Sequence, residues 1–269
     1  MSFLDIKEVK EVEKLLQKLQ KEKVFLKLLN FTMGLNQTKI NSFGNKSDPY
    51  FKKIYTSFEK SIALESKLPE WVLNLDGLSG KKYRHMINNL IALIKNPRYL
   101  EIGSWKGSTS CAATIENKLC ITCIDNWSQK FKKHSWGYVE NPEKVFKTNI
   151  KKCIDKGTKF KFIKKDFREV NYKELGKYNI YLFDGPHHEK DHYDALKFVH
   201  TALDKKFVLI VDDWNWDQVR LGTNKAIQDL NFKIISGFEI MTTQNSSSAY
   251  VQGQNSEWHN GYCFFVIEK

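Results

Sequence analysis

Hydrophobic positions divide the chain into a helical first part and a longer part built from short apolar runs. Over residues 6–31 apolar side chains recur at three- and four-residue steps, which predicts a long amphipathic helix. Residues 36–49 collect Asn, Ser, Gly and Pro and predict a loop. Further helices are predicted over residues 50–68 and 79–96. We therefore expect residues 1–90 to form an N-terminal helical cap.

After the cap, short apolar runs alternate with helical stretches. Alternation of this kind predicts right-handed crossovers and a parallel sheet that is covered on both faces. The runs are RYLEI from Arg98, LCITCI from Leu119, FKFI from Phe160, NIYLF from Asn179 and FVLIV from Phe207. Two more strand-like pieces, FKIISGFEIM and GYCFFVIEK, follow near the end of the chain. The expected fold of residues 91–269 is α/β, a Rossmann-like doubly wound sheet that is mostly parallel with an antiparallel C-terminal strand.

Composition and charge exclude several classes of protein. With 41% hydrophobic and 28% charged residues the chain can build a core, and no segment has the roughly 18 apolar residues of a membrane span. The first residues carry acids and lysines in place of a secretory signal, so we expect a cytoplasmic protein. Of the net charge of +12, residues 1–90 and 91–269 carry +6 each (16 basic against 10 acidic residues, and 27 against 21). There is thus no basic tail, and nucleic acid is not an expected partner.

The sharpest local motif is YLEIGSWKGSTS, which starts at Tyr99. Gly103 permits a tight turn after the strand, and Gly107 would let the backbone approach a ligand. Asp125 follows at the tip of the second strand, where a carboxylate can accept hydrogen bonds from both hydroxyls of a ribose. The spacing E-x-G-x-x-x-G differs from the dinucleotide fingerprint and from the phosphate-binding P-loop. The two features together predict a nucleoside-binding half-sheet.

Three aspartates end the next two apolar runs. Asp184 closes NIYLFD, and Asp212 with Asp213 closes FVLIVDD. If these strands are neighbours, their tips lie about 4.8 Å apart and the three carboxylates converge. Like charges so close favour a hard cation such as Mg²⁺, Mn²⁺ or Ca²⁺ between them. The alternative is that one of the paired aspartates caps the following helix.

Three histidines follow the first of these acids in DGPHHEKDHY. A histidine can deprotonate a hydroxyl near neutral pH, because its unperturbed pKa is about 6.5. His187 and His188 are the candidates for this base, and His192 either orients a ligand or lies on the surface.

These motifs resemble the class I S-adenosylmethionine-dependent methyltransferases over about residues 98–269. Within that class the acidic strand ends and His187, three positions after Asp184, resemble the metal-dependent sugar O-methyltransferases of the macrocin and mycinamicin type. The resemblance implies S-adenosylmethionine and a divalent metal, Mg²⁺ or Mn²⁺, as cofactors. It implies Asp184, Asp212 and Asp213 as metal ligands, and His187, Asp184 and His188 as catalytic residues. The implied cofactor-binding residues are Glu101, Gly103, Ser104, Gly107, Ser108, Thr109, Asp125, Asn126, Trp127, Asp166 and Asp184.

In this family Asp166 would contact the adenine, and Trp127 would either stack near the adenosine or serve only in packing. The implied acceptor is a hydroxyl of a sugar, a nucleotide sugar or a related small molecule. Three alternatives remain: a nucleic-acid methyltransferase, a non-catalytic Rossmann-like binding protein, and a metal-dependent hydrolase or hydroxylase. The first would be expected to carry an N-P-P-Y-like tetrad or a catalytic cysteine, whereas this chain reads LFDGPHH there. The N-terminal helices are a candidate surface for a homo-oligomer.

Overall fold

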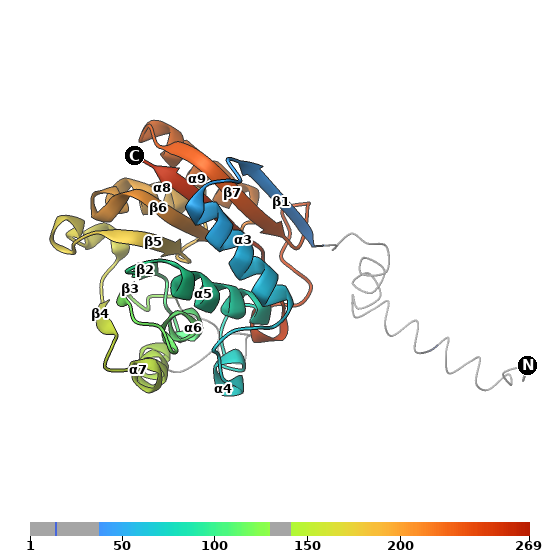
Figure 1. The fold of residues 1–269 in the computed structure, drawn as a ribbon, viewed down its shortest axis with the longest axis vertical. Helices are drawn as coiled ribbons and strands as arrows, with labels where there is room; N and C mark the ends of the chain where they lie inside the picture. The colour runs from blue at the N-terminus through green and yellow to red at the C-terminus, as the bar shows by residue number, and fades with distance from the viewer. Residues whose placement is uncertain (1–13, 15–37, 130–140) are drawn as a thin grey trace, which may run out of the picture.

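An eight-stranded sheet runs through the part of the protein that the computed structural model describes, namely residue 14 and residues 38–129 and 141–269 (Figure 1). Its order is β1-β7-β8-β6-β5-β2-β3-β4. The strands are β1 (Lys39–Gly44), β2 (Arg98–Ile102), β3 (Cys120–Ile124), β4 (Lys159–Ile163), β5 (Tyr178–Phe183), β6 (Leu203–Asp212), β7 (Lys233–Met241) and β8 (Tyr262–Glu268). The long helix predicted over residues 6–31 lies outside the described residues, apart from residue 14, and stays a prediction.

The sheet has a parallel half and an antiparallel half. Strands β6, β5, β2, β3 and β4 pair in parallel, whereas β8 is antiparallel to both β6 and β7. This confirms the predicted Rossmann-like fold, which is mostly parallel in its central strands and has an antiparallel C-terminal strand. None of the helices within the described ranges has the length and apolar character needed to cross a membrane.

Helices cover both faces of the sheet. The first face carries α3 (Pro49–Ile62), α5 (Lys81–Leu93), α6 (Ser108–Thr114) and α7 (Pro142–Cys153), and the second carries α8 (Glu189–Val199) and α9 (Asp217–Asp229). A short helix, α4 (Glu70–Leu73), precedes α5, and single 3₁₀ turns lie at Phe167–Glu169, Tyr172–Glu174, His200–Ala202 and Gly253–Asn255. Successive strand residues face opposite sides. Ile180 and Leu182 of β5 accordingly belong to the first core, and Tyr181 and Phe183 to the second.

The loop predicted over residues 36–49 is partly wrong, because Lys39–Gly44 forms the edge strand β1. This strand pairs antiparallel with β7 at the end of the sheet (Figure 1). Its Phe43 ring packs edge-on against Phe265 at 6.0 Å. A Cβ on Gly237 of β7 would lie 2.1 Å from the Phe43 ring, so that the absence of a side chain there makes room for the ring.

The helix predicted over residues 50–68 ends earlier than expected. In the structure α3 stops at Ile62, and Leu64 adopts a left-handed φ of 57°, which breaks the helical path. The helix predicted over residues 79–96 corresponds to α5. The division of the chain at residue 90 stays a prediction, although β1 joins the same sheet as the later strands.

The register of the parallel strands determines what meets at their carboxyl edge. Ile102 of β2 pairs with Ile124 of β3 on one side and with Phe183 of β5 on the other, and Phe183 pairs with Val211 of β6. The residues that follow these positions therefore lie at one level. Those residues are Gly103, Asp125, Asp184 and Asp212.

Candidate active site

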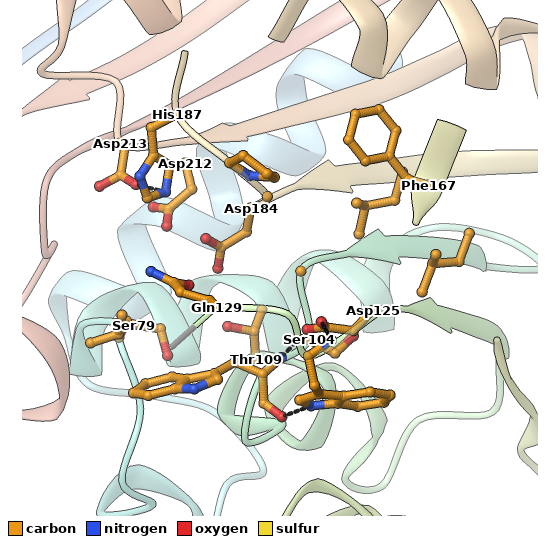
Figure 2. Close-up of a pocket in the computed structure, with 18 of the residues that line it drawn as sticks. Ser79, Ser104, Thr109, Asp125, Gln129, Phe167, Asp184, His187, Asp212 and Asp213 are labelled. Carbon is orange, nitrogen blue, oxygen red and sulfur yellow. Dashed lines mark hydrogen bonds and ion pairs between the residues drawn. The ribbon is translucent and has the colours of Figure 1, made fainter. Parts of the chain in front are cut away.

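A cavity of about 500 Å³ opens at the carboxyl edge of the sheet. Figure 2 shows His187, Asp212 and Asp213 grouped on one side of it, with Asp184 between them and the side that carries Ser104, Thr109 and Asp125. Most of the predicted site residues line this cavity: Gly103, Ser104, Ser108, Thr109, Asp125, Asn126, Trp127, Asp166, Asp184, His187, His188, Asp212 and Asp213. Two predicted residues, Glu101 and Gly107, are not among its lining.

The turn after β2 needs glycine for reasons of space as well as conformation. Gly103 has φ +91°, and a Cβ there would lie 1.7 Å from the backbone oxygen of Asp184. Gly107 has φ +83° and precedes α6, where a Cβ would lie 2.9 Å from the Phe146 ring. Gly103 thus lets the ends of β2 and β5 approach each other, and Gly107 accommodates a protein side chain rather than a ligand.

Glu101 lies beneath the turn and is almost fully buried. Its carboxylate accepts hydrogen bonds from Tyr99 Oη at 2.7 Å and from Ser110 Oγ. Burial raises the pKa of Glu101 above its ordinary value, and these hydrogen bonds oppose that shift. The side chain therefore ties β2 to α6 below the cavity floor.

Asp125 joins the first turn to the loop after β3. Its Oδ2 accepts from the backbone N–H of Trp105 and its Oδ1 from that of Trp127, both at 2.7 Å. Burial raises the pKa of Asp125. Trp127 in turn donates from Nε1 to the Trp105 oxygen at 2.8 Å, and its ring lies 5.5 Å from Phe146. Trp127 thus lines the cavity and packs against the core at the same time.

Asp166 lies after β4 at the rim of the same cavity. It caps the following 3₁₀ turn by accepting from the backbone N–H of Arg168 at 2.9 Å. Asn126 donates from Nδ2 to the other carboxylate oxygen at 3.4 Å. Asp125, Asn126 and Asp166 consequently form one polar side of the cavity.

Asp213 is the one member of the acidic cluster whose charge has close partners. Its Oδ2 lies 2.8 Å from His187 Nε2, and its Oδ1 accepts from Asn260 Nδ2 at 2.7 Å. Burial by itself would raise the pKa of Asp213, but His187, together with His259 and Asn260, lowers it to about 2. Asp213 is therefore ionised throughout the physiological pH range.

Asp184 and Asp212 are in the opposite situation. Burial raises the pKa of both residues well above the ordinary range of an aspartate. Repulsion from Asp212 adds to the shift of Asp184, and repulsion from Asp213 adds to that of Asp212. Asp212 is 3% exposed, and its Oδ1 has no hydrogen-bond partner within the described ranges. Two such groups need a shared proton or a cation between them.

The three histidines that follow Asp184 have three different environments. Burial lowers the pKa of His187, but Asp213 together with Asp212 and Asp191 outweighs that effect, and the pKa lies above its ordinary value. His188 is exposed and caps α8 in a reciprocal arrangement with Asp191. His192 is buried against Phe183, so a surface position for it is wrong, and burial lowers its pKa to about 3.

Potential metal ligands fall into two overlapping groups. Asp184, His187 and Asp213 offer ligand atoms within 4.8 Å of one another, as do Asp212, Asp213 and His259. The three predicted aspartates are thus brought to one place, and Asp213 belongs to both groups.

Sequence reasoning missed the contribution of the C-terminal loop. Asp212 of β6 pairs with Tyr262 of β8, and because these strands are antiparallel, the residues before Tyr262 reach the carboxyl edge of the sheet. His259 and Asn260 line the cavity for this reason. The run GYCFFVIEK signalled a strand, but its pairing with β6 is not readable from local pattern.

A second missed element comes from the turn before α5. Ser79 lines the cavity, and its Oγ lies 3.0 Å from Ser108 Oγ. This turn is bound to the C-terminal loop by backbone hydrogen bonds, from Lys81 N to Ser256 O at 2.8 Å and from Gln254 N to Gly77 O at 3.1 Å. We call residues 77–83 and 252–260 together the pocket wall.

Comparisons with known proteins give one family match and several similar solved structures. Residues 100–214 match a family model described as a methyltransferase domain. A search of curated proteins finds no match. Among solved structures the chain is similar to TrmN from Thermus thermophilus, with 15% identity, a TM-score of 0.45 and 79% of this chain covered. The chain spans about half, 52%, of that protein.

The chain is also similar to an O-methyltransferase from Bacillus cereus solved in complex with SAH, with 9% identity, a TM-score of 0.45 and coverage of 81% and 91% of the two chains. Likenesses at this distance decide neither acceptor nor mechanism. The family match, which begins in β2 and ends just after Asp213, contains the glycine turn and all three clustered aspartates. Residues 100–214 are accordingly similar to a methyltransferase domain, and they lie in a sheet of Rossmann-like order.

Proposed function

We propose that the protein is an S-adenosylmethionine-dependent O-methyltransferase that uses a divalent cation to methylate a hydroxyl of a sugar, nucleotide sugar or related small molecule. The observation that carries the proposal is a group of three carboxylates, the buried Asp212 and Asp213 and the half-buried Asp184, which lines the same cavity as the glycine turn. A methyltransferase that acts on carbon or on a nitrogen base has no evident need for such a group.

The glycine-turn side of the cavity fits the donor. Ser104 Oγ is buried and has no hydrogen-bond partner among the described residues, so it is available to a ligand in the cavity. Each carboxylate oxygen of Asp125 accepts one backbone N–H and retains a lone pair for a ribose hydroxyl. Gly103, Ser108, Thr109, Asn126, Trp127 and Asp166 complete this side. S-adenosylmethionine, when bound, supplies the methyl group as an electrophilic carbon on a sulfonium centre.

Glu101 and Gly107 contribute from outside the cavity in this proposal. Glu101 holds Ser110 and Tyr99, and so fixes the start of α6 relative to the end of β2. Both residues therefore shape the donor site without touching the donor.

The acidic side fits a hard divalent cation. Asp212 Oδ1 is a buried acceptor without a partner in the described ranges, and burial together with repulsion from neighbouring carboxylates raises the pKa values of Asp184 and Asp212. Carboxylate ligands suit both Mg²⁺ and Mn²⁺. When bound, such a cation would orient two hydroxyls of the acceptor and lower the pKa of one of them.

His187 is the residue we assign as the base. Its Nε2 lies 2.8 Å from Asp213 Oδ2, which leaves the lone pair on Nδ1 to accept a proton from the acceptor hydroxyl. The Asp213 carboxylate stabilises the imidazolium that results, as the raised pKa of His187 indicates. Asp184 faces the same space, whereas His188 is engaged with Asp191 in capping α8, which makes it the weaker candidate for the base.

Aromatic and polar groups beside His187 are suited to a sugar ring. Trp216 lies edge-on to His187 at 4.9 Å and lines the cavity, and aromatic faces stack well against the apolar faces of sugars. Ser248 and Gln252 add neutral polar groups nearby. The acceptor would then lie between Trp216 and the pocket wall.

The proposal is tested by measuring consumption of S-adenosylmethionine against a panel of free sugars, nucleotide sugars and RNA, each with Mn²⁺, Mg²⁺ or a chelator. We expect turnover with one class of sugar, and we expect the chelator to abolish it. Methylation of RNA, or full turnover of a sugar in the presence of the chelator, would refute the proposal.

A further inference from the structure

Asn260 of the C-terminal loop holds the carboxylate of Asp213 in one orientation. The Asn260 side chain is buried, and its Oδ1 accepts from the backbone N–H of Ala249 at 2.8 Å. Because this contact identifies the amide oxygen, the other end of the amide is the nitrogen, and it donates to Asp213 Oδ1 at 2.7 Å. The amide is thus fixed at both ends.

His259 presents a hydrogen atom, not a lone pair, to the same carboxylate. A backbone N–H can only donate, and that of Gly253 lies 3.0 Å from His259 Nδ1, so Nδ1 must be the acceptor. Because Nδ1 is the acceptor, the ring carries its proton on the other nitrogen, Nε2. This Nε2 lies 3.8 Å from Asp213 Oδ1. A protonated ring nitrogen cannot ligate a cation.

Asp213 needs such support from outside its own strand. Its φ of 54° takes the backbone out of the extended path of β6, which ends one residue earlier. The adjoining backbone is joined to the C-terminal loop as well, because Trp214 N donates to Gly261 O at 3.2 Å and Asn215 N to Asn260 O at 2.9 Å. The loop is therefore bound to the segment that carries Asp213.

We propose that Asn260 and His259 are positioning residues for Asp213, which hold its Oδ2 toward His187, and that neither residue binds the cation. Asp212, Asp213 and His259 then do not form a three-ligand site, because His259 is not a ligand. The cation would draw its protein ligands from Asp184, Asp212 and Asp213. This inference rests on the proposed function.

The variant Asn260→Asp distinguishes two roles of Asn260, namely orienting the Asp213 carboxylate and holding the backbone of Ala249. The aspartate retains an oxygen for the Ala249 N–H but replaces the donor to Asp213 by an acceptor. We expect the turnover number to fall at least tenfold while the KM for S-adenosylmethionine stays within twofold. If Asn260 served only to hold Ala249, Asn260→Asp would keep the wild-type turnover number, and that result would overturn the inference. Asn245→Asp is the matched control, because Asn245 lies exposed in the same loop.

Binding of Mn²⁺ alone to the purified protein, measured by calorimetry, provides a readout that needs no turnover. Asn260→Ala should weaken Mn²⁺ binding about tenfold, within the range for a residue that supports a ligand. The unfolding midpoint, recorded alongside, verifies that each variant is folded. Unchanged Mn²⁺ affinity in a folded Asn260→Ala protein would contradict the assigned role.

His259→Gln tests the second half of the inference, since the glutamine amide can still donate toward Asp213. Its Mn²⁺ affinity should remain within tenfold of wild type, whereas a larger loss would identify His259 as a ligand. A wild-type protein that binds Mn²⁺ but methylates no acceptor refutes the proposed function, and the Mn²⁺ affinities of the variants still decide the inference. A wild-type protein that binds no Mn²⁺ refutes both.

Discussion

Asp212 and Asp213 are adjacent in the chain, yet their carboxyl groups have opposite electrostatic surroundings. Asp213 is held by His187 and Asn260, which lower its pKa, while burial and the charge of Asp213 raise the pKa of Asp212. Removing a paired buried charge costs stability, and removing an unpaired one relieves a cost. Two substitutions of the same type should therefore change the stability of the metal-free protein in opposite directions.

We expect Asp212→Asn to raise the free energy of unfolding by about 1 kcal/mol with a chelator present at pH 7.5, and Asp213→Asn to lower it by about 2 kcal/mol. Urea denaturation followed by circular dichroism measures both. Both variants should lose Mn²⁺ binding. A destabilised Asp212→Asn protein would mean that Asp212 has a partner that compensates its charge.

Gly103 and Gly176 form a matched pair for testing the glycine turn. Both have a positive φ, of 91° and 90°, but a Cβ on Gly103 would meet the Asp184 backbone at 1.7 Å, whereas nothing lies within 4 Å of one on Gly176. Gly176→Ala should cost about 1 kcal/mol and leave donor affinity unchanged. Gly103→Ala should abolish binding of S-adenosylmethionine in calorimetry. Equal donor affinity in the two variants would contradict the role given to the turn.

At the scale of elements, the sequence predicts those strands that carry a clear apolar run of their own. The runs NIYLF and FVLIV are apolar, end in acids and lie next to each other in the sheet, so Asp184, Asp212 and Asp213 could be expected at one edge. The strand KINSFG carries only two large apolar residues, and its partner β7 is almost 200 residues away in the chain. A strand stabilised by so distant a partner leaves little local signal.

The positions of His259 and Asn260 also depend on pairing between strands that are distant in the chain. They reach the site because β8 pairs antiparallel with β6, and that choice depends on the whole sheet. The local pattern likewise could not separate the roles of His187, His188 and His192, because burial against Phe183 and capping of α8 depend on tertiary packing.

The edge strand gives an element-scale prediction through Phe43 and Gly237. In the wild-type background Gly237→Ala should destabilise the protein, because the new Cβ would displace the Phe43 ring. In a Phe43→Ala background the same substitution should be neutral or stabilising. Urea denaturation of the four proteins should give a coupling energy of about 1 to 3 kcal/mol. A coupling near zero would indicate that Phe43 does not occupy the space above Gly237.

At the scale of the whole molecule, the acidic cluster couples stability to pH and to metal. The folded-state pKa values of Asp184 and Asp212 are raised, so the folded protein binds more protons than the unfolded chain and loses stability as pH rises through those pKa values. The raised pKa of His187 acts in the same direction, since its contribution is complete below about pH 6.5 and is lost as pH rises through the folded-state pKa.

His192 and His259 act in the opposite direction because their pKa values are lowered, so the effect of the carboxyl groups is read against Asp212→Asn, which keeps both histidines. The thermal midpoint of the chelated wild-type protein should fall more, or rise less, between pH 5 and pH 8 than that of Asp212→Asn, and Mn²⁺ should raise the wild-type midpoint more at pH 8 than at pH 5. Differential scanning fluorimetry at matched ionic strength measures both effects. Asp212→Asn is the control, because it lacks one of the two carboxyl groups with a raised pKa. An equal effect of Mn²⁺ at the two pH values would indicate a binding site away from these carboxyl groups.

The pocket wall is built from two segments that are far apart in the chain, residues 77–83 and 252–260. This limits how the specificity for the acceptor can change. Backbone hydrogen bonds join Gly77 and Lys81 to Gln254 and Ser256, and Tyr83 stacks on Tyr262 at 3.7 Å just behind them. Replacing the N-terminal part, which includes α3, α5 and residues 77–83, by that of another protein would break these contacts and expose the first face of the sheet to solvent. New acceptor specificity should instead arise by single replacements at positions such as Ser79 or Gln252. Their side chains can change while the backbone hydrogen bonds between the two segments of the pocket wall are kept.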